Sequence, residues 1–183
     1  MRRARTLAGA GLLLLLATPL AAQSQPGTDA LFAALKAAPS EDAAAAVEAQ
    51  IRAQWDKSAS PAVRLLLSRG ARELSEGAPG DALDSFDAAL DLSPDLLDAW
   101  RARARARRAL GDWAGATRDL EELLKREPHS FVAFEDLSSL AESRGDWRGA
   151  LAAWQKVLEI SPHTPNGQTR LQDLRRRALG EEL

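Results

Sequence analysis

Cysteine and tyrosine are absent from this 183-residue sequence, and histidine occurs only twice. Without cysteine the chain can form no disulfide, no thiolate metal site and no cysteine nucleophile. Two histidines leave little material for acid–base chemistry near neutral pH. β-Branched residues are also few whereas alanine and leucine are abundant, and this composition favours helix over sheet. The formal net charge of −2 argues against general binding to nucleic acid, which needs excess positive charge.

Segment 1–22 has the three-part pattern of a secretory signal peptide. A basic start, MRRART, precedes the apolar run LAGAGLLLLLA, and TPLAAQSQP then supplies a helix breaker and small residues. We expect cleavage after Ala22, with a cut after Ser24 as the alternative. The apolar run is short for a bilayer span, so no membrane insertion is expected after cleavage. Cleavage after Ala22 removes three positive and no negative charges, which changes the net charge from −2 to −5. The signal-peptide pattern predicts an exported, periplasmic protein.

The chain repeats itself with a 34-residue period. The string GDWAGA at 111–116 returns as GDWRGA at 145–150, and further columns align at the same spacing. They divide the chain into unit one (61–94), unit two (95–128) and unit three (129–162). The column residues are Gly70, Ala82 and Pro94 in unit one, Trp100, Ala104, Gly111, Ala116 and Pro128 in unit two, and Gly145, Ala150 and Pro162 in unit three.

Each unit is predicted to form two antiparallel helices joined at its glycine. Small residues such as Ala104 and Ala116 lie on either side of the turn, where two helices approach closely only if side chains are small. Gly111 suits the position after a helix, which often takes a left-handed backbone, and Asp112 suits the cap of the next helix. Pro128 ends the second helix, because proline lacks the N–H that the helix needs.

This 34-residue helix–turn–helix pattern resembles the tetratricopeptide repeat family. Trp100, Ala104, Gly111, Ala116, Leu123 and Pro128, with their counterparts in the other units, carry the resemblance. It implies an all-α, right-handed α-solenoid whose first helices line a concave groove that binds peptides or partner helices. Arg69, Arg103 and Arg107 depart from the family pattern, which has large apolar residues there. The arrangement also resembles small exported repeat proteins of alphaproteobacteria.

Both flanks of the repeats are predicted to be caps, because the ends of a solenoid expose an apolar face. Segment 23–60 should form two N-terminal capping helices broken at Pro39, with Ser40 as a helix cap, and should cover unit one. Segment 163–183 should form a C-terminal capping helix that ends at Gly180.

No catalytic or metal site is predicted. His129 and His163 are separated by one repeat period and each follows a repeat-ending proline, so the repeat explains their spacing. A two-histidine metal site is disfavoured, because neither has a ligand partner three or four positions further on. A phosphate loop after a strand and a Gly-x-Ser-x-Gly motif are both absent from the sequence. We therefore expect a protein without enzymatic activity, cofactor or metal.

Five arginines crowd the segment WRARARARR at 100–108. Arg101, Arg105 and Arg108 share one helical face. The resemblance places that face in the groove, where the candidate binding residues are Arg64, Arg101, Arg105, Arg108, Glu135, Ser139 and Glu142. One interpretation is a basic strip that binds the carboxylate of an acidic peptide or of a chain terminus. The other, which we favour, is internal pairing with Glu135, Glu142 and nearby aspartates.

The sequence thus predicts a non-catalytic protein–protein interaction module of the cell envelope. It would act as an adaptor or assembly factor that binds a peptide or partner helix in the groove, without nucleic acid. The alternative is a structural protein that self-associates through its solenoid ends, since incompletely capped ends can pair with each other.

Overall fold

The computed structural model describes residues 26–56 and 59–180, and within these residues it contains nine α-helices and no strand. The predicted signal peptide lies outside the described residues. None of the helices in this part of the chain is both long and apolar enough to span a membrane. The helices are α1 (Pro26–Lys36), α2 (Glu41–Asp56), α3 (Pro61–Ser75), α4 (Pro79–Leu92), α5 (Leu97–Ala109), α6 (Trp113–Arg126), α7 (Phe131–Ser143), α8 (Trp147–Ile160) and α9 (Gly167–Leu179).

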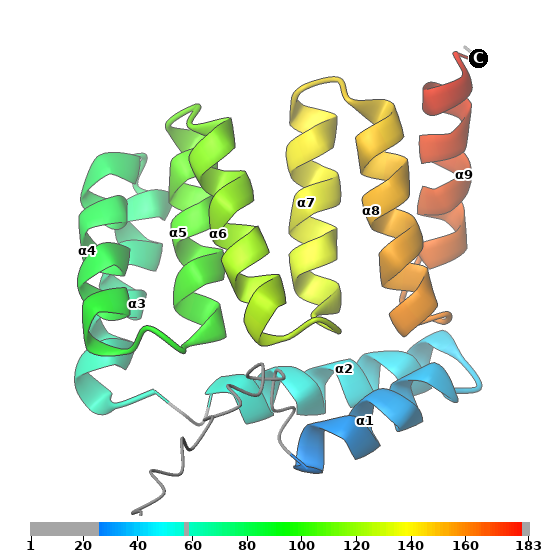
Figure 1. Ribbon diagram of the computed structural model, residues 1–183, viewed down its shortest axis with the longest axis horizontal. Helices are drawn as coiled ribbons and strands as arrows, with labels where there is room; N and C mark the ends of the chain where they lie inside the picture. The colour runs from blue at the N-terminus through cyan, green and yellow to red at the C-terminus, as the bar shows by residue number, and fades with distance from the viewer. Residues whose placement is uncertain (1–25, 57–58, 181–183) are drawn as a thin grey trace, which may run out of the picture.

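Six of these helices form three antiparallel pairs that stack side by side (Figure 1). The pairs are α3 with α4, α5 with α6, and α7 with α8, one for each 34-residue unit. Helix α9 packs on α8 and closes the C-terminal end of the stack. The predicted all-α solenoid of three helical pairs is therefore confirmed.

The turn within each pair follows the glycine prediction. Gly77, Gly111 and Gly145 have φ angles of +78°, +78° and +72°, a left-handed conformation in which a side chain is strained. Asp112 then accepts a hydrogen bond from the backbone N–H of Gly115 at 2.8 Å and caps α6, and unit three repeats this cap at α8. The repeated Gly-Asp dipeptide therefore stops one helix and starts the next.

Small residues set how closely the two helices of a pair approach. A Cβ added to Gly70 would lie 2.6 Å from the ring of Phe86 on α4, so this crossing requires glycine. In unit three the same column holds Ser138, whose buried hydroxyl donates to the carbonyl of Ala150 at 3.0 Å. The small columns are thus contacts between helices, as the sequence predicts.

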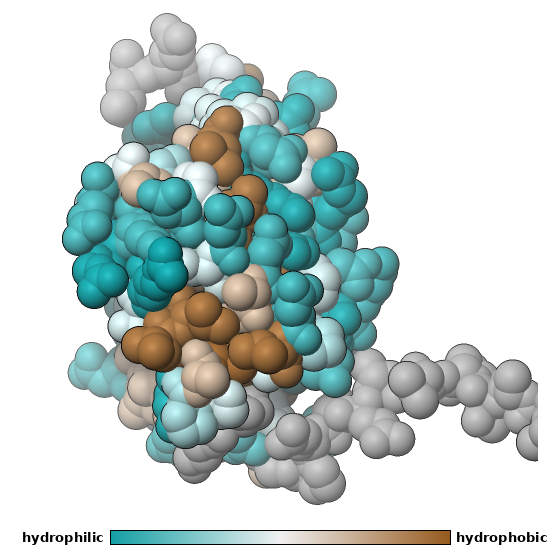
Figure 2. Space-filling model, turned by 90° about the vertical axis from the view of Figure 1, so that its left-hand side faces the viewer, coloured by the Kyte–Doolittle hydropathy of each residue, from teal (hydrophilic) through white to brown (hydrophobic). Residues whose placement is uncertain are grey.

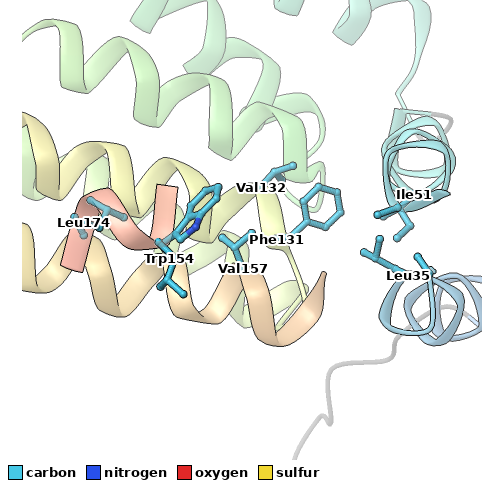
Figure 3. Packing of buried hydrophobic residues seen from close by; sticks show 11 residues of the cluster. Leu35, Ile51, Phe131, Val132, Trp154, Val157 and Leu174 are labelled. Carbon is cyan, nitrogen blue, oxygen red and sulfur yellow. The ribbon is translucent and has the colours of Figure 1, made fainter. Parts of the chain in front are cut away.

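The N-terminal hairpin, α1 and α2, does not cover unit one, and this expectation was wrong. The hairpin lies across the ends of α5 to α8 (Figure 1). Leu35 and Ile51, both fully buried, face Phe131 at the start of α7 (Figure 3). The hairpin has a continuous apolar stripe, and the Phe131–Val132 pair offers an apolar surface to match it. Unit one instead presents a mixed surface of leucine and arginine.

Polar contacts hold the hairpin in this place. The buried carboxylate of Glu48 accepts a hydrogen bond from the hydroxyl of Ser161, which follows α8, at 3.0 Å. The backbone N–H of Asn166 donates to Glu41 at 3.3 Å. Arg52 lies over the ring of Phe131, 4.9 Å from its centroid. The hairpin is therefore tied to the start of α7 and to the loop that follows α8.

A concave groove with apolar, basic and acidic parts

The inner helices α3, α5 and α7 place equivalent residues side by side, because each unit repeats the geometry of the one before it. Three columns run across the groove in this way. They are Leu67/Arg101/Glu135, Ala71/Arg105/Ser139 and Leu74/Arg108/Glu142. The groove is therefore apolar at unit one, basic at unit two, and acidic or polar at unit three.

A hollow of about 370 Å³ lies between α3 and α5 on this face. It is large enough for one or two side chains of a partner, and near the lower limit of small-molecule pockets. Its apolar wall comes from α3 and from the buried ring of Phe86, and its polar wall comes from α5. The lining residues are Leu67, Ala71, Leu74, Phe86, Asp98, Arg101, Ala102 and Arg105.

Two of the predicted arginines share one aspartate of α7. Arg101 Nε lies 2.6 Å from Asp136 Oδ2, and Arg105 Nη2 lies 3.4 Å from Asp136 Oδ1. Internal pairing therefore occurs with a nearby aspartate, as expected, whereas neither Glu135 nor Glu142 pairs with these two arginines. Arg101 is 20% exposed and tightly held, whereas Arg105 is 45% exposed and makes the longer contact. The two arginines thus differ in their freedom to meet a ligand.

The guanidinium of Arg108 makes no hydrogen bond or ion pair with any other described residue. It is half-buried near Arg105 and Asp136, beside the apolar side chain of Leu140. Asp98 lies near the opposite end of α5, roughly 15 Å away along the helix. The basic part of the groove is therefore concentrated near the C-terminal end of α5.

Arg64 does not join this strip. Its guanidinium donates a hydrogen bond to the carbonyl of Ala59 at the start of α3, and its side chain is exposed. Leu67 lines the hollow from α3 together with Ala71 and Leu74, whereas Arg64 does not. The position of Leu67 one repeat period before Arg101 could have identified it from the sequence.

Glu142 and Ser139 are engaged by a residue that the sequence analysis missed, Arg170 of α9. Arg170 forms an ion pair with Glu142, donates to the hydroxyl of Ser139 at 3.4 Å, and lies over the ring of Trp154. Arg170 lies one repeat period after Asp136, so the periodicity extends into α9 and could have pointed to it. Helix α9 thus occupies the acidic end of the groove.

Glu135 lies where the N-terminal hairpin approaches the groove. Burial raises the pKa of its carboxyl, while the charge of Arg52 on α2 lowers the pKa and that of Glu48 raises it. The neighbouring concave residue, Val132, is 2% exposed, since it belongs to the core that the hairpin completes. The hairpin and α9 therefore cover the unit-three part of the groove, and the hollow between α3 and α5 is left open.

The two remaining arginines of α5 point into unit two rather than into the groove. Arg103 donates from Nε and Nη2 to Asp119 at 3.1 and 2.8 Å, and Arg107 Nη1 reaches the same carboxylate at 2.7 Å. Arg103 also donates to Asp87 of α4 at 2.7 Å. This pairing with Asp119 explains why arginines can stand where the family pattern has large apolar residues, since ion pairs replace the apolar contacts.

The histidine positions do not form a metal site with any described residue. Among the described residues there is no group of three or more histidine, aspartate or glutamate side chains that could hold a metal ion. The ring of His129 lies 5.4 Å from that of Phe32 and helps to dock α1.

Stacked helical pairs with a 34-residue period and a concave inner face form an α-solenoid like those built from tetratricopeptide repeats. No family model matches the chain. A TPR repeat-containing protein of Rhizobium etli is 30% identical over 112 residues, covering 61% of this chain and 55% of that protein. Tetratricopeptide repeat protein 36 of Mus musculus is 45% identical over 53 residues, covering 29% of this chain and 28% of that protein. The chain thus spans about half or less of the length of these curated relatives.

Solved structures share the fold at low sequence identity. The first TPR of Spaghetti (RPAP3), bound to an HSP90 peptide, has a TM-score of 0.59 at 20% identity and covers 67% of this chain and 98% of that one. The Yersinia enterocolitica type III secretion chaperone SycD, in complex with a peptide of the translocator YopD, has a TM-score of 0.56 at 14% identity and covers 67% and 93%. Together with the curated relatives, they confirm the resemblance to the tetratricopeptide repeat family.

Proposed function

We propose that this chain is a non-catalytic protein-interaction module that binds a peptide segment of a partner protein in the hollow between α3 and α5. The observation that carries this proposal is the hollow itself, which joins an apolar wall to a basic one. The segment best suited to it has a large apolar side chain beside a carboxylate.

The apolar wall supplies affinity. Leu67 and Leu74 are half-buried rather than buried, and each turns toward the hollow. An inserted leucine or phenylalanine would bury apolar surface on both partners, at about 25 cal/mol for each Å² removed from water. A side chain of that size fits the volume of the hollow.

The basic wall supplies specificity. Arg101 is already paired with Asp136 and would keep the wall in place, whereas Arg105 lines the hollow and can turn to an incoming carboxylate. Arg108 lies next to Arg105 outside the hollow and would reach in from its edge. A guanidinium binds a carboxylate through two parallel hydrogen bonds, which fixes the orientation of the ligand as well as its charge. This division of roles combines the two interpretations of the arginine strip.

The solved relatives support this use of the fold. Spaghetti and SycD were each solved with a peptide, and both have folds similar to that of this chain. Their low identity means that the chemistry of the peptide must be inferred from this chain's own groove.

A selection from a phage-displayed random peptide library tests the proposal. We expect the enriched peptides to combine a large apolar residue with an aspartate or glutamate, and fluorescence anisotropy with a labelled peptide to show weaker binding at high salt. The variant R105Q/R108Q should lose binding, and so should Leu74→Glu. The matched control is R118Q/R148Q, which removes two exposed arginines elsewhere and should bind normally. Equal binding by R105Q/R108Q and wild type would remove the arginines from the site.

We further propose that the chain acts in the cell envelope as an adaptor or assembly factor. The motivation is the amino-terminal sequence, in which a basic start, an apolar run and small residues follow one another. N-terminal sequencing of the protein from its source should begin at Gln23 or Gln25. Recovery of intact Met1 from cytosolic protein would contradict the proposed export.

A further inference from the structure

The outer face of α3 is a stacking surface without a helix on it among the described residues. In units two and three the second helix of the preceding unit covers the first helix. Ala99 and Ala133 are consequently 0% exposed, whereas their counterpart in unit one, Leu65, is 71% exposed. The same position of the repeat is thus interior in two units and surface in the third.

This outer face consists of one row on α3 together with the end of α4. Leu92, the last residue of α4, is 61% exposed and adds a second large apolar side chain. Figure 2 looks onto this end of the stack, where apolar residues gather in the lower half among hydrophilic ones. The row on α3 comprises Ala62, Leu65, Arg69 and Arg72, whose counterparts Leu96, Ala99, Arg103 and Ala106 are buried or half-buried in unit two.

The opposite end of the stack is closed. Leu171 and Leu174 of α9 are buried, and the outward side of α9 is polar and exposed at Gln168, Gln172 and Arg175. A polar outer face is what a terminal cap of a solenoid requires. Because the N-terminal hairpin lies across α5 to α8, only the C-terminal end has such a cap among the described helices (Figure 1).

We infer that the outer face of α3 and α4 pairs with the same face of a second copy of this chain. A head-to-tail contact would set this apolar end against the polar side of α9, whereas a two-fold contact joins two apolar ends and closes. The inference is independent of the proposed peptide groove, which lies on another side of α3.

Charges on the face specify the arrangement. With a two-fold axis parallel to the helices, α3 of one copy lies on α4 of the other. Leu65 and Leu92 lie near the same end of the antiparallel pair, so each would contact the other across the axis. Arg72 lies three turns after the start of α3 and Asp81 three turns before the end of α4, so each is about 16 Å from that end. An arginine of one copy would then face an aspartate of the other, twice.

Sedimentation velocity of the full chain over a wide concentration range tests the inference. We expect wild type to sediment as a dimer at high concentration, and Leu65→Glu and Leu92→Glu as monomers with unchanged helical circular dichroism. Leu179→Glu is the matched control, because Leu179 on α9 is also 71% exposed and its loss should leave the dimer intact. A wild type that is monomeric at every concentration would overturn the inference. Dissociation by Leu179→Glu as well as by Leu65→Glu would overturn it in favour of a head-to-tail contact.

A charge reversal tests the orientation. Arg72→Glu and Asp81→Arg should each weaken the dimer about tenfold or more, and the double variant should recover it. Failure of the double variant to recover would exclude the proposed axis. The dimer variants should also bind the selected groove peptide normally, so loss of the dimer and loss of the groove activity remain distinguishable.

Discussion

The interiors of units two and three differ at equivalent positions, although the two helical pairs have the same backbone plan. Between α5 and α6, Arg103 and Arg107 converge on Asp119, which is 1% exposed. Between α7 and α8 the space is apolar. The three residues that occupy the same columns there are Leu137, Ala141 and Ala153.

Unit one is intermediate, with a polar network in place of the ionic one. Arg69 pairs with Glu73 at 2.7 Å, and the hydroxyl of Ser85 donates to the same carboxylate at 2.7 Å. The repeat is therefore specified by its turns and small columns, which all three units share. The remaining columns need only be complementary to each other within a unit.

Complementarity in unit two depends on charges that stay fixed. Burial opposes the charge of Arg103, but hydrogen bonds to Asp119 and Asp87 outweigh it and raise the pKa above its ordinary value. Arg103 therefore remains charged and needs its carboxylates. Removing one partner of a buried ion pair lowers stability more than replacing all the paired residues by apolar ones.

The largest expected effect follows from removing the shared carboxylate. Asp119→Ala removes the buried carboxylate that Arg103 and Arg107 share, leaves Arg103 with Asp87 alone, and should lower the free energy of unfolding by about 3–5 kcal/mol. Urea denaturation followed by circular dichroism measures the change. Ser85→Ala, in the same column of unit one, is the control and should cost about 1 kcal/mol, the value of an ordinary hydrogen bond. Equal losses of free energy of unfolding would show that the ionic cluster contributes no more to stability than an ordinary hydrogen bond.

Replacing Arg103, Arg107 and Asp119 together by the residues of unit three should leave the free energy of unfolding unchanged or raise it. The variant R103L/R107A/D119A removes both arginines together with their shared carboxylate, leaves only the half-exposed Asp87, and should be neutral or more stable by about 1–4 kcal/mol. The same urea melts measure this. A loss as large as that of Asp119→Ala would mean that the columns of unit three do not fit unit two.

The shared columns should behave alike in both units. Ala116→Leu and Ala150→Leu each overfill a close helix contact at a residue no more than 1% exposed, and each should cost about 1–3 kcal/mol. Thermal melts of the two variants should therefore be similar. A large cost in only one unit would show that the backbone plans differ more than their common turns indicate.

The smallest effect concerns Glu135 of unit three, the counterpart of Arg101. Because burial raises its pKa on folding, its contribution to stability is full below the unfolded pKa and is lost as pH rises through the folded pKa. Between the unfolded and the folded pKa of Glu135, the stability of Glu135→Gln should therefore decline less with rising pH than that of wild type. At neutral pH the variant should be more stable than wild type. Urea melts at a series of pH values measure it, with the exposed Glu121→Gln as control. An unchanged pH profile would contradict the burial of this carboxyl.

Local signals predicted the repeat correctly. Gly111 with Asp112, the small columns and the prolines act within one helical pair, so their spacing along the chain carries the information. The arginine face of α5 was predicted for the same reason, because helical periodicity alone places Arg101, Arg105 and Arg108 together. Nearby aspartates were expected as partners of that face, but only Glu135 and Glu142 were named. Which residue of α7 meets α5, Asp136 or its neighbour Glu135, depends on how the two helices are rotated against each other.

The amino-acid sequence by itself determined the helices, their turns and their 34-residue stacking, because these follow from backbone conformation and from contacts at short and regular separations. Only the tertiary structure decided where the N-terminal hairpin docks. Glu48 and Ser161 are 113 residues apart, and no periodicity relates them. The hairpin settles where its apolar stripe finds a matching surface, at Phe131 and Val132. That choice leaves the hollow between α3 and α5 open and Leu65 at the end of the stack exposed.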